Sequence, residues 1–198
     1  MPQVTLRPYV TADEDAAIEL WRRTWSKHYP HLDFNARVAW WRERWRNELV
    51  ATAQIVLAEQ GEALVGFVTV DPKTMYLDQI VVAPEHWGSN VALILLDEAK
   101  RLSPTGLDLL VNKDNFRAIG FYGKHGFVYV GDDKNPVSGI AVDRMAWRPL
   151  GLCHLGTAVL PTARRDRLKR QARHACPPRR CGHGRSPGCG HSSGRWRA

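Results

Sequence analysis

Hydrophobic positions along the first 150 residues repeat with two different periods, which predict alternating helices and strands. Two sets of residues recur every three or four positions, as on the buried face of a helix: Ile18, Trp21 and Trp25, then Val38, Trp41 and Trp45. The second set predicts a helix over about residues 35–49. Thr11 and Glu14 have the Thr-x-x-Glu spacing at which two side chains satisfy the free amides of a helix start. We therefore expect the first helix to begin at Thr11.

Later in the chain, β-rich runs alternate with two further helical stretches. VALILLDEAKRL, residues 91–102, is typical of a helix that ends at Ser103-Pro104, and NFRAIGFYGKHG, residues 115–126, is typical of another, closed by a glycine. The stretches typical of strands are residues 4–10, 53–60, 63–72, 75–84, 106–112, 127–132 and 139–149. The second and third of these are joined by Gly61-Glu62, which predicts an antiparallel hairpin. Together the elements predict an α/β fold with a largely buried mixed sheet.

Charge divides the chain at about residue 150. The net charge is +8 at pH 7, and all of the excess positive charge falls in residues 151–198, where Asp166 is the only acid. This segment is rich in Arg, Gly, Pro and Cys and lacks an apolar period after Leu160. We therefore predict a domain over residues 1–150 followed by a disordered basic tail over residues 151–198. The cysteines and histidines of the tail match no standard zinc spacing, and we predict no metal site.

The tail leaves two alternatives open. A polybasic segment can bind nucleic acid or anionic surfaces without sequence specificity, or it can be an extension with no selected role. No apolar run approaches the roughly 20 residues of a membrane span. The opening MPQVTLRPYV lacks the apolar centre of a signal peptide. We therefore expect a cytoplasmic protein with no membrane partner.

The stretch PEHWGSNVAL, residues 84–93, joins a predicted strand to a predicted helix through small residues. Free amides and the positive dipole end at such a helix start attract a phosphate, and short side chains such as those of Gly88 and Ser89 let it approach. Most turns of this kind start a helix and bind no phosphate. The residues of the turn alone do not decide between these two roles.

Two stretches, in order, resemble the signatures of a known family. Asn-x-x-Ala-Ile-x-Phe-Tyr-x-x-x-Gly-Phe, residues 115–127, is similar to the second signature of the GNAT superfamily of acyl-CoA-dependent N-acetyltransferases. The turn resembles the first signature, Gln/Arg-x-x-Gly-x-Gly/Ala. With the N-terminal strand and the paired helices, the resemblance covers residues 4–148. It implies a single domain whose mixed, mostly antiparallel sheet has six to seven strands, with a splayed central parallel pair and about four helices.

The resemblance also implies acetyl-CoA as cosubstrate and suggests which residues hold it. The pantetheine arm would lie in the gap between the two splayed strands, against Ile80 and Val82. Asn115 would lie beside the pantetheine and Tyr122 near the thioester sulfur. The pyrophosphate would lie against the turn, whose residues are Trp87, Gly88, Ser89, Asn90, Val91 and Ala92.

The turn departs from the family signature at two positions. Trp87 stands where the family has Gln or Arg, and Asn90 stands where it has glycine. Asparagine tolerates a left-handed backbone and is a good helix N-cap, so we expect the turn to form. Its carboxamide takes up room that glycine would leave free, and we expect Asn90→Gly to tighten acetyl-CoA binding by on the order of 1 kcal/mol.

Direct acetyl transfer to an amine, as the family implies, needs a proton acceptor and a proton donor. A lysine-like amine is almost wholly charged at pH 7, and freeing its lone pair costs roughly 4–5 kcal/mol. Asp78 is the only carboxylate in the strand over residues 75–84 and is the candidate base, directly or through a water. A structural hydrogen-bond acceptor is the alternative role for Asp78. Tyr122 is the candidate donor to the departing thiolate.

Aromatic residues crowd the region that covers the acceptor in the family, residues 21–45. Tyr29, His31 and Trp40 lie off the helix stripe or in the loop and could frame an acceptor pocket, with Tyr76 positioning a water. Loop aromatics that only cover the core are the alternative. The predicted acceptor is a primary amine on a small molecule, an amino acid or a peptide, and a homodimer is compatible with the fold. The alternative function is a non-catalytic protein of this fold that binds nucleic acid through its basic tail.

Overall fold

The structure, a computed structural model, describes residues 3–135 and 139–149, and the basic tail predicted to be disordered lies outside this part of the chain. Seven strands form one sheet in the order β1-β2-β3-β4-β5-β7-β6. They are β1 (Val4–Pro8), β2 (Gln54–Gln60), β3 (Ala63–Asp71), β4 (Tyr76–Val82), β5 (Leu107–Asn112), β6 (Val128–Lys134) and β7 (Ala141–Trp147). All neighbouring strands pair antiparallel except β4 and β5, which are parallel. The predicted mixed, mostly antiparallel sheet is confirmed.

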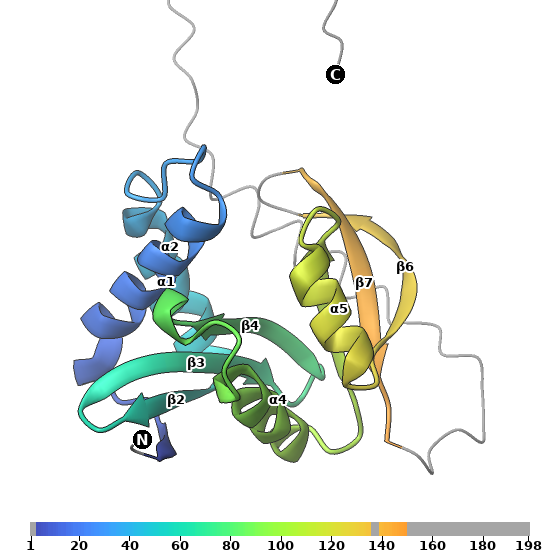
Figure 1. The fold of residues 1–198 in the computed structure, drawn as a ribbon, viewed down its shortest axis with the longest axis horizontal. Helices are drawn as coiled ribbons and strands as arrows, with labels where there is room; N and C mark the ends of the chain where they lie inside the picture. The colour runs from blue at the N-terminus through green and yellow to red at the C-terminus, as the bar shows by residue number, and fades with distance from the viewer. Residues whose placement is uncertain (1–2, 136–138, 150–198) are drawn as a thin grey trace, which may run out of the picture.

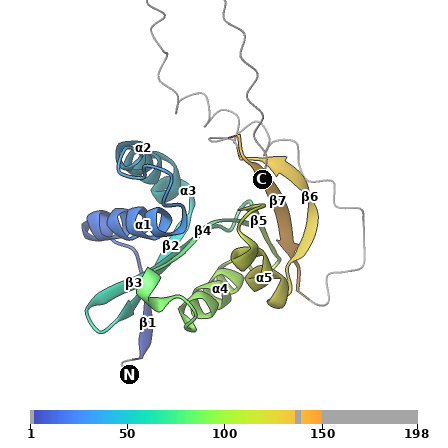
Figure 2. The same ribbon diagram turned by 45° about the horizontal axis from the view of Figure 1, so that its top comes forward.

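Helices cover both faces of the sheet (Figure 1). They are α1 (Glu14–His28), α2 (Val38–Arg44), α3 (Val50–Thr52), α4 (Val91–Leu102) and α5 (Phe116–Lys124), with a π-helical turn η2 (Trp45–Leu49) and short 3-10 turns η1 (Thr11–Asp13) and η3 (Pro84–His86). Figure 2 shows α1 and α2 on one face and α4 and α5 on the other. Among the described residues, no helix is both long and apolar enough to cross a membrane.

The tryptophan stripe on the first two helices packs as predicted. Trp21, Trp41 and Trp45 are buried, with exposed fractions of 5%, 1% and 0%. The rings of Trp21 and Trp41 stack at 4.7 Å between centroids, and Trp45 meets Phe67 of β3 edge-on at 5.3 Å. Burial of rings this large contributes much of the stability of the α1–α2 layer. The helix predicted over residues 35–49 is present as an unbroken helical run over residues 38–52, in which the π-helical turn η2 lies between α2 and α3.

The predicted start of the first helix is wrong in its details. Thr11 lies in η1, and the backbone N–H of Val10 donates to the Asp13 carboxylate at 2.9 Å. Glu14 caps nothing, because its carboxylate accepts hydrogen bonds from the guanidinium groups of Arg42 and Arg46. The helix-start spacing is present in the sequence, but the stronger charge-assisted partners come from another helix.

The parallel strands β4 and β5 separate soon after they meet. They share one bridge, at Tyr76 and Asp108. The register of β3 with β4 shifts there, since Thr69 lies opposite Gln79 and Val70 lies opposite Leu77, which makes Asp78 the extra residue of a β-bulge. A bulge bends its strand and increases the local twist, and this bend turns β4 away from β5. The predicted splayed pair is confirmed.

Candidate active site

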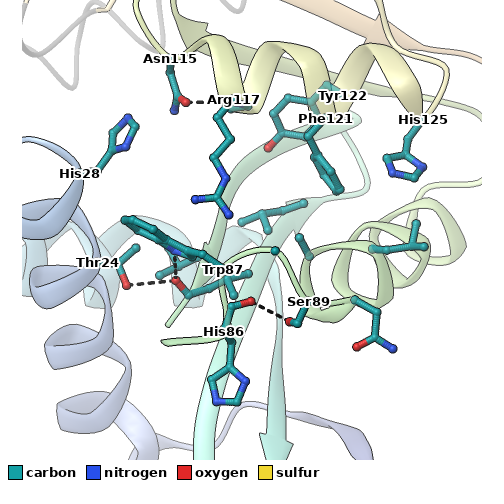
Figure 3. A pocket seen from close by; sticks show the side chains of 18 of the residues that line it. Thr24, His28, His86, Trp87, Ser89, Asn115, Arg117, Phe121, Tyr122 and His125 are labelled. Carbon is teal, nitrogen blue, oxygen red and sulfur yellow. Dashed lines mark hydrogen bonds between the residues drawn. The ribbon is translucent and has the colours of Figure 1, made fainter. Parts of the chain in front are cut away.

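A cavity of about 450 Å³ opens where β4 and β5 separate. Residues of α1, β4, α5 and the turn before α4 line it (Figure 3). Its volume is within the usual range of small-molecule sites, about 300–1,000 Å³. The predicted acetyl-CoA residues that line it are Ile80, Val82, Trp87, Gly88, Ser89, Asn90, Ala92, Asn115 and Tyr122. The structure therefore brings most of that set together, although Val91 is buried in the core (1% exposed).

The turn before α4 and the first turn of α4 contain unpartnered backbone amides in residues that line the cavity. Among the described residues, the N–H groups of Gly88, Asn90, Ala92 and Leu93 form no hydrogen bond, whereas the N–H of Val91 donates to Ser89 Oγ at 3.3 Å. The Ser89 hydroxyl in turn donates to the His86 carbonyl at 2.7 Å. Free amides together with the positive end of the α4 dipole form an anion-binding arrangement.

The left-handed position of this turn is Gly88 and not Asn90. Gly88 has φ 89, a conformation that glycine adopts without strain. Asn90 has φ −82 and ψ −1, and although it occupies the N-cap position its side chain makes no capping bond. The turn forms as expected, but Asn90 contributes neither a left-handed backbone nor a side-chain cap to it.

Trp87 bridges three walls of the cavity. Its indole Nε1 donates to the Val82 carbonyl at 2.9 Å, and the Thr24 hydroxyl approaches the same oxygen at 3.4 Å. The Arg117 guanidinium lies over the indole ring, 4.9 Å from its centroid, and the His28 ring meets it edge-on at 6.4 Å. Trp87 thus links α1, β4 and α5 across the space between the separated strands (Figure 3).

The charged side chains of the cavity lining are cationic. Arg117 and Lys124 come from α5, and three histidines, His28, His86 and His125, also line the cavity. No Asp or Glu is among the described residues that line the cavity. A lining of this kind, next to unpartnered amides, suits a ligand that carries several negative charges.

Tyr122 and Asn115 both lie on α5 and face the cavity. Tyr122 is 9% exposed, and burial raises the pKa of its hydroxyl well above its ordinary value, so that the group keeps its proton at neutral pH. Asn115 is the N-cap of α5, and its Oδ1 accepts a hydrogen bond from the Ala118 N–H at 3.1 Å. The second signature therefore places a proton donor and a helix cap along one wall.

Asp78, the candidate base, does not line the cavity. Its carboxylate accepts two hydrogen bonds from the Arg44 guanidinium, one at 3.1 Å, and a third from the Gln79 amide at 3.0 Å. Burial alone would raise the pKa of Asp78, but the charge and the hydrogen bonds of Arg44 outweigh burial and hold the pKa below its ordinary value. Asp78 is thus a charged, fully engaged group at the bulge of β4.

The candidate acceptor residues Tyr29, His31, Trp40 and Tyr76 lie outside the cavity lining. The Tyr29 hydroxyl donates to Asp114 at 2.8 Å and accepts from the Asn112 amide at 3.0 Å. Burial, with the neighbouring Asp114 carboxylate, raises the pKa of Tyr29 to about 12. Tyr29 ties the end of α1 to the loop before α5, and the acceptor roles of these residues stay predictions.

Two cavity residues carry no local signal in the sequence. His28 lies at the last position of α1 and Arg117 in the first turn of α5. Neither belongs to a hydrophobic period or to a fixed position of the quoted signatures, so only the fold, in which the end of α1 and the start of α5 line the same cavity, brings them together. No group of three or more His, Cys, Asp or Glu residues in the described part of the chain could hold a metal ion. Nucleic-acid binding by the tail concerns residues outside that part and stays a prediction.

Comparisons with known proteins point to one family. A sequence profile described as "Acetyltransferase (GNAT) family" matches residues 14–127. No curated protein matches the chain significantly in sequence.

Solved structures of N-acetyltransferases share the fold. The GCN5-related N-acetyltransferase from Rhodopseudomonas palustris has 19% identity and a TM-score of 0.64, and the match covers 75% of this chain and 98% of that one. PaiA N-acetyltransferase from Thermoplasma acidophilum, solved in complex with coenzyme A, has 20% identity and a TM-score of 0.64, over 74% and 99%. The ribosomal-protein-S18-alanine N-acetyltransferase from Escherichia coli has 19% identity and a TM-score of 0.60, over 78% and 100%. At these identities the likeness is one of fold.

Proposed function

Because the chain belongs to the acetyltransferase (GNAT) family, we propose that it is an N-acetyltransferase that moves the acetyl group of acetyl-CoA directly to a primary amine. The acceptor is a small molecule, an amino acid or a peptide. A family member solved with coenzyme A supports the choice of acyl donor. The observation that carries the proposal is the cavity itself, where unpartnered amides and cationic side chains lie at the opening between β4 and β5.

The residues present fit a bound coenzyme A. The free amides of Gly88, Asn90, Ala92 and Leu93 would hold the pyrophosphate. Arg117 and Lys124 would add charge-assisted contacts from α5. The edge of β4 at Ile80 and Val82 would offer main-chain groups to the pantetheine arm, as a sheet edge does to an extended peptide, except for the Val82 carbonyl, which accepts from Trp87. Acetyl-CoA, when bound, supplies an activated acetyl thioester.

Tyr122 would protonate the sulfur that leaves. Its hydroxyl keeps its proton at neutral pH, and it lines the same cavity as the amides. A positioned donor of this kind contributes typically 10²–10⁴-fold to the rate. The assignment of Asp78 as the base stays a prediction. In the structure, the Asp78 carboxylate accepts hydrogen bonds from Arg44.

Thiol release from acetyl-CoA, measured across a panel of amines, tests the proposal. The panel should contain dipeptides, single amino acids, a polyamine and an Nα-blocked lysine. In parallel, acetyl-CoA should raise the melting temperature, because a ligand at about 100 times its Kd adds about 2.7 kcal/mol to stability.

A matched pair of arginine variants checks the place of binding. Arg117→Gln should weaken acetyl-CoA binding about tenfold, since it removes a cation from the cavity wall. Arg101→Gln, at the far end of α4 and paired with Glu98, should leave the affinity unchanged. Absence of any thermal shift at millimolar acetyl-CoA, or equal effects of the two variants, would refute the assignment of the cavity.

A further inference from the structure

The α1 wall of the cavity contains a single ionisable side chain, His28. The other α1 residues of the lining are Thr24 and Trp25, and the Thr24 hydroxyl is directed at the Val82 carbonyl. The amides that suit a phosphate lie at the start of α4, on the opposite face of the sheet from α1 (Figure 2). On the proposed function, an extended ligand held by those amides would run through the gap between β4 and β5 toward α1. His28, which lies beside Trp87 on that wall, would then face the acyl end of the ligand.

The imidazole of His28 is free to take a proton. Among the described residues, neither ring nitrogen forms a hydrogen bond, and the ring is held by aromatic contacts with Tyr29 at 4.4 Å and Trp25 at 6.0 Å. Burial lowers the pKa of His28 below its ordinary 6.5, and Arg117 acts in the same direction while Asp114 opposes them. The imidazole is consequently neutral at pH 7, which is the form that accepts a proton.

Other proton acceptors are less well placed. No carboxylate is among the described residues that line the cavity, and the Asp78 carboxylate is bound by Arg44. Two further histidines line the cavity away from α1. His86 extends to the far side of the turn from Trp87, and His125 lies at the end of α5 with its ring against Phe121 at 4.8 Å (Figure 3).

We propose that His28 is the catalytic base that removes the proton of the acceptor ammonium, a role that rests on the proposed function. The N–H bond of the ammonium breaks, the electron pair stays on nitrogen, and the proton binds a free nitrogen of His28. That pair forms the new C–N bond as the C–S bond of the thioester breaks. The sulfur takes the Tyr122 proton, and the second amine proton restores the Tyr122 hydroxyl. Each turnover then releases one proton, from His28 to solvent.

A weakly basic imidazole also selects among acceptors. At pH 7 about one peptide α-amine in ten is uncharged, against about one lysine-like amine in 2,500. Proton transfer to His28 is therefore less unfavourable from a peptide α-amine than from a side-chain amine. We therefore expect the α-amino groups of peptides to be acetylated faster than lysine side chains.

The test is the pH dependence of kcat/KM for wild type and His28→Gln between pH 5 and 10. The acceptors are the best α-amine of the panel and an aromatic amine that is uncharged at pH 7. With the α-amine, wild type should give a bell, which rises as His28 loses its proton below about pH 6.5 and falls as the amine loses its own. His28→Gln should lower the rate at pH 7 by about 10²-fold and give a profile that only rises toward the amine pKa. With the aromatic amine, which needs no deprotonation before attack, the loss should be below about threefold.

Two controls separate catalysis from folding. Calorimetric binding of acetyl-CoA to His28→Gln should match wild type, and the ring signals of His28 in NMR spectra should titrate below pH 6.5 and vanish in the variant. His86→Gln, whatever its effect on acetyl-CoA affinity, should keep the bell-shaped profile.

A bell that persists in His28→Gln, or an equal loss with both acceptors, would overturn the assignment. If wild type releases thiol with no amine of the panel, the proposed function itself fails. Transfer that is independent of His28 overturns only the present inference.

Discussion

Asp78→Asn should destabilise the fold strongly, because it leaves Arg44 charged without its main partner. The two side chains are 10% and 13% exposed, so most of the pair is removed from water. Breaking a buried ion pair by removing one partner costs about 3–5 kcal/mol. Glu48 stays near Arg44, at 3.2 Å from Nε, and the Arg44 guanidinium also lies over the Trp41 ring at 5.2 Å. Because these contacts remain, we expect the free energy of unfolding to fall by about 3 kcal/mol, the lower end of that range.

Urea unfolding followed by circular dichroism at pH 7 measures this loss. Glu85→Gln is the matched control, since Arg23 and Glu85 also form a two-pronged pair but are 34% and 55% exposed. An exposed pair is worth about 0–1 kcal/mol, so the control should change little. The double variant Arg44→Met, Asp78→Leu should recover most of the stability, because it removes both charges.

The contribution of Asp78 to folding stability should decrease at low pH. The pKa of Asp78 in the folded protein lies below its ordinary 3.8. Its stabilising contribution is therefore complete above the unfolded pKa and is lost as the pH falls through the folded one. A loss below about 1 kcal/mol for Asp78→Asn at pH 7 would show that water screens the pair, and the argument from burial would be wrong.

Two further substitutions test the cavity. Tyr122→Phe should lower kcat by about 10²-fold with little change in acetyl-CoA affinity, because a proton donor acts mainly in the transition state. Rapid-mixing kinetics measures the rate and calorimetry the affinity. An equal loss of binding would make Tyr122 structural. Asn90→Gly should tighten acetyl-CoA binding by on the order of 1 kcal/mol, because it removes a side chain from the amides without removing a capping bond. Weaker binding in calorimetric titration would instead identify Asn90 as a phosphate contact.

The elements could be predicted from the sequence because burial fixes them. Trp41 and Trp45 are almost wholly buried, Trp41 against Trp21 of α1 and Trp45 against Phe67 of β3, as their helical spacing predicts. The start of α1 could not be predicted in the same way. Glu14 has the local spacing of a helix cap, but its partners Arg42 and Arg46 reach it only after α2 packs on α1. A local pattern shows which hydrogen bonds a side chain can make, but not which of its possible partners it binds in the folded protein.

The same distinction divides the site. Asn115 and Tyr122 could be predicted because one short helix carries both and its signature is local. His28 and Arg117 could not, since they line one cavity only because the fold brings the end of α1 and the start of α5 to it. Asp78 is predicted from the sequence to be catalytic because it is the only carboxylate of its strand. Its partner Arg44 lies on α2, far away in the sequence. Residues that depend on distant partners are the ones for which sequence reasoning needs the structure.

The turn before α4 forms without glycine at residue 90, and the reason lies two residues earlier. Gly88 has φ 89, and a Cβ added there would meet nothing within 4 Å, so the need for glycine at that position is conformational and not steric. Asn90 has φ −82, a conformation open to any residue. The family signature leaves residue 88 unspecified and has glycine at the position of residue 90, and only the backbone angles show that the left-handed conformation belongs to Gly88. In this chain Gly88 takes the left-handed conformation, so the room occupied by the Asn90 carboxamide is what distinguishes the turn from one with glycine at residue 90.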